Sequence, residues 1–158
     1  MIRDFRINGA KAPDAMHKAK VTMVTGMGVV KEDSTTDKFA NISDTETVAD
    51  IFIVDKERVP SGINCARGDM SDYDEDFVGI KANEPVSMDK YHAGEKFGTD
   101  QYDETITKEL AIDTKVAWKN GLMTKATIAS PYVFKGFHND NGHLLAQVEV
   151  SDTATTNA

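Results

Sequence analysis

Two Asn-Gly dipeptides in the last third of the chain constrain its fold more than any other feature. Asn120-Gly121 and Asn141-Gly142 each separate runs in which apolar and polar residues alternate. A two-residue hairpin turn of type I′ needs a positive φ at both central residues, and Asn-Gly meets that need well. The alternating runs cover residues 110–118, 122–128, 132–137 and 144–150. We therefore expect an antiparallel meander over Leu110–Val150, with a break at Gly136.

Shorter apolar runs before residue 110 predict further strands. The run at 21–31 contains Gly26 and Gly28, which predict a bend or a close approach by another segment. The run at 48–54, which is continuously apolar from Ile51 to Val54, indicates a central strand. Weaker runs predict a short edge strand at 39–42 and short strands at 77–80 and 86–88, whereas 63–76 and 90–102 have the polar composition of loops.

The whole pattern predicts an all-β chain. About eight short strands separated by turn residues are typical of a small antiparallel β-sandwich or barrel. With 158 residues the chain has the length of one domain. We divide it into an extended N-terminal arm (1–20), a β domain (21–150) and a polar C-terminal tail (151–158). Within the arm, Pro13-Asp14 could begin one helical turn that reaches Lys18.

Charge is distributed unevenly along the chain. The first 31 residues contain six Lys or Arg and two Asp, a net charge of +4, so the remainder carries −12 to give the total of −8. A basic arm on an acidic body favours self-association or docking on an acidic neighbour, and a solvated tail is the alternative. The residues predicted to bind a partner are Arg3, Phe5, Arg6, Lys11, Lys18 and Lys20 in the arm, and Asp72, Asp74 and Asp76 in the acidic loop.

Composition also excludes several classes of protein. A net charge of −8 argues against nucleic-acid binding, because phosphate repels an acidic surface. No apolar run reaches the roughly 18–20 residues of a membrane span, and the N-terminus lacks the apolar core of a signal peptide. With Cys65 as the single cysteine, no intrachain disulfide can form. We expect synthesis and assembly in a cytoplasm.

The acidic loop could in principle bind calcium, a cation that prefers six to eight oxygen ligands. An EF-hand loop that began at Asp72 would need Gly at its sixth position and Glu at its twelfth. Those positions hold Phe77 and Asn83, so the motif fails. We expect a solvated acidic loop and no metal or other cofactor.

Other chemistry-bearing residues do not form a recognisable catalytic set. His138 and His143 flank one Asn-Gly turn and could face each other across a hairpin, but a zinc site needs further ligands. No phosphate-binding loop or nucleophile elbow is present, so we do not expect an enzyme. Four aromatic residues could form a sugar-stacking surface, although strand alternation favours a core position for the first of them: Trp118, Tyr91, Tyr102 and Tyr132.

The order of these features resembles the small capsid decoration, or cement, proteins of tailed bacteriophages. The resemblance spans roughly residues 20–150 and includes the final hairpin. It rests on the segments Gly26-Met27-Gly28-Val29-Val30, 51–57, Asp72-Tyr73-Asp74, 94–102 and Gly121-Leu122.

This resemblance implies a non-enzymatic virion structural protein. Such a protein binds the outer surface of a phage capsid and stabilises contacts between major capsid protein subunits. The implied partners are the major capsid protein and neighbouring copies of the chain, possible trimers included, on a particle assembled in the bacterial cytoplasm. A tail-tube or head–tail connector subunit and a calcium- or carbohydrate-binding β-sandwich module stay open as alternatives.

Overall fold

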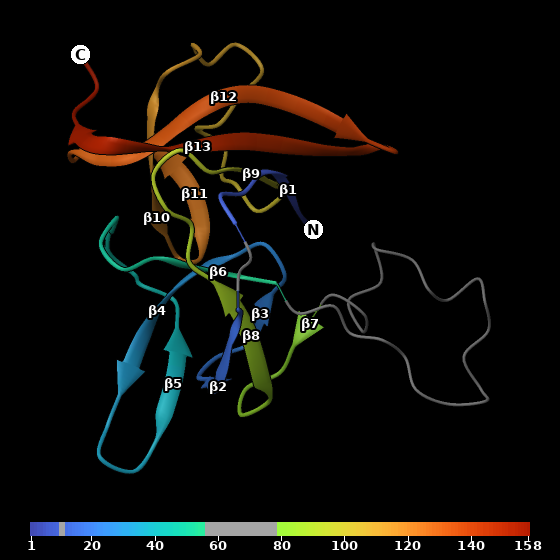
Figure 1. Ribbon diagram of the computed structural model, residues 1–158, viewed down its shortest axis with the longest axis vertical. Helices are drawn as coiled ribbons and strands as arrows, with labels where there is room; N and C mark the ends of the chain where they lie inside the picture. The colour runs from blue at the N-terminus through green and yellow to red at the C-terminus, as the bar shows by residue number, and fades with distance from the viewer. Residues whose placement is uncertain (10–11, 56–78) are drawn as a thin grey trace.

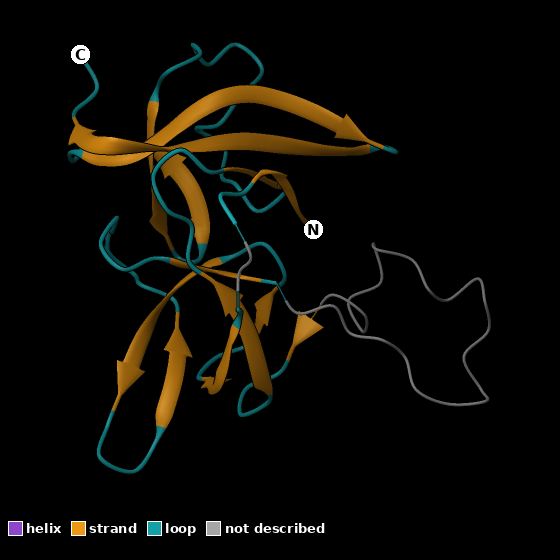
Figure 2. Ribbon diagram, in the orientation of Figure 1, coloured by secondary structure: helices purple, strands orange, loops and turns teal. Residues whose placement is uncertain are grey.

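The computed structural model of the chain describes residues 1–9, 12–55 and 79–158. The regular secondary structure of these residues consists of β-strands alone (Figures 1 and 2). The thirteen strands of these described ranges form a six-stranded sheet, a closed five-stranded barrel and a small two-stranded sheet. The expectation of an all-β fold is confirmed. In the view of Figure 1 the six-stranded sheet lies above the barrel.

Most strands are short, and the two longest lie at the C-terminal end of the chain. Their bounds are β1 (Ile2–Arg6), β2 (Asp14–Ala19), β3 (Met23–Val24), β4 (Gly28–Asp33), β5 (Lys38–Asn41), β6 (Phe52–Val54), β7 (Gly79–Ile80), β8 (Pro85–Asp89), β9 (Lys96–Thr99), β10 (Lys115–Lys119), β11 (Leu122–Lys125), β12 (Ser130–Asp140) and β13 (His143–Thr155).

The six-stranded sheet is antiparallel throughout, in the order β1-β9-β13-β12-β10-β11. Both predicted turns are confirmed, because φ is 52° and 78° at Asn120-Gly121 and 51° and 98° at Asn141-Gly142. The predicted meander is wrong in one respect. β12 pairs with the side of β10 away from β11, so β11 and β12 are not neighbours.

Two local expectations about this sheet also need correction. Residues 110–114 form turns in place of the start of a strand, with a positive φ at Asp113. Gly136 does not end β12. It lies in a bulge between Phe134 and Phe137, with a φ of 93°, and the strand continues on the other side.

The barrel has the order β2-β5-β4-β6-β8 and closes through the pairing of β8 with β2. β2 and β5 are parallel, and the other four pairs are antiparallel. Two predictions about the barrel are wrong. Asp14–Ala19 is a strand and not a helical turn, and Lys38–Asn41 lies inside the closed barrel and not at an edge. In the six-stranded sheet, β9 lies within residues 90–102, where a loop was predicted. β8 confirms the strand predicted at 86–88.

The predicted arm and tail both belong to the sheets. β1 and β2 are extended, but they pair with β9 and with the barrel of the same chain. β13 continues to Thr155, past the boundary expected at residue 151. Asn157 then accepts a hydrogen bond from the Lys115 N–H at 2.7 Å and donates to the carbonyls of Lys115 and Ala126 at 3.0 and 2.7 Å.

The main core is built around Trp118, which is 1% exposed. Phe97 stacks between Trp118 and Tyr91, and the edge of Tyr132 meets the indole. The core position predicted for Trp118 is confirmed. The sugar-stacking hypothesis is wrong, because Trp118, Tyr91 and Tyr132 are all buried. Gly28 allows this packing, since a Cβ there would lie 2.6 Å from the indole. The bend predicted at Gly26 is confirmed by its φ of 97°.

Candidate interaction surface

The basic residues of β1 are ion-paired within the chain. Arg3 forms an ion pair with Asp140 at the end of β12. Arg6 lies 3.2 Å from the Glu149 carboxylate in β13 and donates to the Gly94 carbonyl at 2.7 Å. These contacts hold the first strand against its own sheet. The side chains nevertheless stay 53% and 54% exposed, so part of each guanidinium faces solvent.

An aromatic contact adds to this attachment of β1. The Phe5 ring lies over Gly98 and meets His138 edge to face, with a centroid distance of 5.1 Å. On the other face of the sheet the Tyr91 hydroxyl donates to Asp4 at 2.5 Å. Burial, followed by this hydrogen bond to Asp4, raises the pKa of Tyr91 well above its ordinary value. Tyr91 is therefore a neutral donor that fixes the strand.

The remaining predicted binding residues are not gathered in one place. Lys20 is ion-paired with Glu32, which also accepts a hydrogen bond from Asn41 at 2.8 Å. Lys18 lies exposed on β2, and no ion pair of its side chain exists in the part of the chain that the structure describes. The other four, together with Cys65, lie outside the described residues: Lys11, Asp72, Asp74 and Asp76.

The two histidines near the hairpin tip are not cross-strand partners. In the register of β12 and β13, His138 lies opposite Leu145, and His143 lies opposite Asp140. The hypothesis that they face each other is therefore wrong. Residues 1–9, 12–55 and 79–158 contain no group of three or more His, Cys, Asp or Glu that could hold a metal ion.

Sequence reasoning missed a buried polar group in the barrel. His17 is 3% exposed, and its two ring nitrogens lie 3.1 Å from Asp14 and 2.8 Å from Asp33. The pKa of Asp14 lies well below its usual range, mainly because the carboxylate forms an ion pair with Lys31. Because β5 lies between β2 and β4, these contacts join strands that are not neighbours in the barrel. Nothing in the spacing of the four residues signalled this arrangement.

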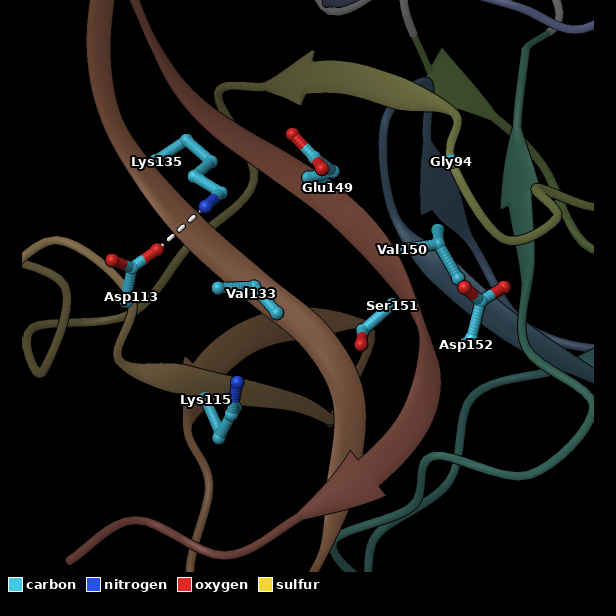
Figure 3. Close-up of a pocket in the computed structure, with 9 residues that line it drawn as sticks. All are labelled: Gly94, Asp113, Lys115, Val133, Lys135, Glu149, Val150, Ser151 and Asp152. Carbon is cyan, nitrogen blue, oxygen red and sulfur yellow. Dashed lines mark hydrogen bonds and ion pairs between the residues drawn. The ribbon is translucent and has the colours of Figure 1, made fainter.

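A shallow groove crosses the outer face of the six-stranded sheet (Figure 3). It has a volume of about 320 Å³, and the side chains along it come mainly from β10, β12 and β13. We call it the outer groove, and the residues that line it are Gly94, Asp113, Lys115, Val133, Lys135, Glu149, Val150, Ser151 and Asp152.

Strand register explains why charged residues meet in the outer groove. Residues directly opposite each other in antiparallel strands point to the same face. Lys115 lies opposite Val133, Val133 opposite Glu149, and Glu149 opposite Lys96, which in turn lies opposite Arg6. The alternation of β10 and β13 in the sequence placed Lys115 and Glu149 on an outward face. The pairing of β10 with β12, which brings them together, had no sequence signal.

The charges in the outer groove are partly neutralised. Lys135 bonds to Asp113 at 2.5 Å and holds the pKa of that carboxyl below its usual range (Figure 3). Glu149 is paired with Arg6. The side chains of Lys115 and Asp152 have no ion-pair partner among the described residues. Within those residues, one cation and one anion that line this groove therefore form no ion pair, and Lys115 acts on Asp113 only through space.

Comparison of the chain with protein-family models, with curated proteins and with solved structures found no match. No helix in the described ranges has the length and hydropathy to span a membrane.

Proposed function

We propose that the chain is a non-enzymatic structural protein of a phage virion. It binds the outer surface of the capsid and stabilises contacts between major capsid protein subunits. The particle is assembled in the cytoplasm of the bacterial host. The proposal rests on the resemblance described above.

The observation that best supports this role is the long hairpin of β12 and β13. The two strands have 11 and 13 residues, and the hairpin extends well beyond the rest of the sheet (Figure 1). β9 pairs with β13 along one side, and the Arg3–Asp140 ion pair ties β1 to the tip. A projecting element that is held on a sheet presents its tip in one geometry, which suits contact with a repeating protein surface.

The exposed arginines of β1 provide a second contact surface beside the hairpin. A guanidinium has five N–H donors, and Arg3 and Arg6 use only part of them within the chain. The remaining donors can bind carboxylates of a capsid subunit while the internal ion pairs hold each side chain in place. On a closed shell many copies bind at once, so contacts that are individually weak produce a stable layer.

Binding to undecorated phage heads tests this proposal. Purified protein is mixed with the heads, which are then sedimented and heated. We expect the protein to co-sediment and to raise the temperature at which the heads release DNA. Arg3→Glu should weaken co-sedimentation, whereas Lys125→Glu, which makes the same charge change at an exposed position on β11, should not. Absence of both co-sedimentation and heat protection with the unmodified protein would refute the proposal.

A further inference from the structure

The charges around the outer groove nearly balance, on a protein that is acidic overall. The chain carries a net charge of −8, so two copies repel each other over most of their surfaces. The groove, with Lys96 and Arg6 beside it, contributes four cations and three anions, a net of +1: Arg6, Lys96, Lys115 and Lys135 against Asp113, Glu149 and Asp152. Electrostatic repulsion between copies is therefore small at this face.

The two unpaired charges have opposite signs and lie on opposite sides of β12. Lys115 is on β10 and Asp152 is on β13, and these strands flank β12 in the sheet (Figure 3). Lys115 is level with Glu149, so two strand spacings across the sheet, roughly 10 Å, and three residues along β13, roughly 10 Å more, separate Lys115 from Asp152. A two-fold axis over the middle strand exchanges the two sides, so that Lys115 of one copy meets Asp152 of the other, and the reverse contact forms at the same time.

We propose that the outer groove is a two-fold interface between two copies of this chain, held by reciprocal Lys115–Asp152 ion pairs. Val133 lies between Lys115 and Glu149 in the register and is 6% exposed, so the middle of the face offers little apolar surface and the contact depends on the charges. The two internal ion pairs neutralise the remaining charges of the groove lining before the copies meet. This inference is independent of capsid binding.

A second copy fits the groove better than an acidic or a basic ligand. An acidic peptide would meet Glu149 and Asp152, and a basic one would meet Lys115 and Lys135, so the lining selects neither sign. A copy of the same face offers both signs in the matching arrangement. The shared face is small by the standard of stable complexes, and exposed ion pairs fix orientation more than they raise affinity. We therefore expect a weak dimer.

Sedimentation velocity on the full chain tests the proposal, at concentrations from about 10 µM to about 1 mM. The unmodified protein should shift from monomer to dimer over this range. Lys115→Glu and Asp152→Lys each replace both ion pairs by like-charge contacts, so each variant alone should dimerise at least tenfold more weakly, which corresponds to about 1.4 kcal/mol. Lys125→Glu and Asp44→Lys make the same changes in net charge at exposed positions on other segments and should leave the dimer intact.

Mixing the two variants gives the decisive result. In a mixed dimer of Lys115→Glu with Asp152→Lys, both contacts again join opposite charges, so an equimolar mixture should dimerise although neither variant does alone. The same mixture excludes misfolding as the reason for the losses. The proposal is overturned if the unmodified protein stays monomeric up to about 1 mM. It is equally overturned if either variant dimerises normally, or if the mixture stays monomeric.

Discussion

Replacing Gly98 by alanine should loosen β1 without disturbing the core. A Cβ at Gly98 would lie 2.7 Å from Cε2 of Phe5 and 3.2 Å from Cβ of Leu145, closer than ordinary van der Waals contact. Because Phe5 lies on an edge strand, the chain can relieve this overlap by moving the ring away. The cost of relieving this overlap cannot exceed what the docked ring contributes, and the tight contact with Leu145 adds only a small further cost. Complete loss of a buried Phe side chain costs about 3–5 kcal/mol, so for a partly buried ring we expect roughly 1.5–2.5 kcal/mol.

A double-mutant cycle isolates this contact. Phe5→Ala alone should destabilise the protein by about the same amount, roughly 1.5–2.5 kcal/mol. In the Phe5→Ala background, Gly98→Ala should cost less than about 0.5 kcal/mol, because the ring that the added Cβ would overlap has been removed. Urea unfolding gives the free energies, and hydrogen exchange should show faster exchange in residues 2–6 but not in β10.

Gly136→Ala serves as the control for the cycle. Gly136 has a positive φ, but a Cβ added there would meet no atom within 4 Å apart from its chain neighbours, so the substitution introduces backbone strain without a clash. It should cost about 1 kcal/mol whether Phe5 is present or not. If Gly98→Ala is as costly in the Phe5→Ala background as in the unmodified protein, the packing of Phe5 on Gly98 does not hold β1, and the reasoning is wrong.

Three further substitutions test other parts of the fold. Gly28→Ala pushes a Cβ into the indole of Trp118 and should lower stability by about 1–3 kcal/mol; an unchanged melting temperature would contradict this packing. Asp14 has a lowered pKa beside Lys31, so its stabilising effect is present above about pH 4 and is lost as the pH falls; Asp14→Asn should make urea unfolding less dependent on pH in the acid range. Asn157→Ala removes three hydrogen bonds to the end of the sheet and should cost about 1–2 kcal/mol, with faster amide exchange at the start of β10 as the sign that the tail has detached.

Local sequence signals predicted the fold class and the turns because each depends on a few neighbouring residues. The two Asn-Gly turns require positive φ, which few other residue pairs adopt at low cost. The bend at Gly26 and the burial of Trp118 followed from the same kind of evidence. Strand order did not follow, since the pairing of β10 with β12 depends on contacts between whole strand faces that no short motif records.

The candidate surface was only partly predictable for the same reason. The sequence identified Arg3 and Arg6 as exposed basic residues, but their partners Asp140 and Glu149 lie more than 130 residues away along the chain. The sequence did not predict β9, because this strand is short and contains Gly98, a residue type that weakens a strand prediction. The sequence of β2 carries the signal of a helical turn because Pro13 suits both the start of a helix and the start of a strand.

The strand order has a consequence for how the chain folds during synthesis. All five barrel strands precede residue 90, so the barrel can close while the rest of the chain is still being made. β1 precedes all the barrel strands, yet it pairs with β9, which follows the barrel and pairs in turn with β13. Domains generally fold as their segments emerge, and contacts between distant segments form slowly. On the ribosome, β1 can therefore pair only after β9 has been made, and the other side of β9 is covered only after β13 has emerged.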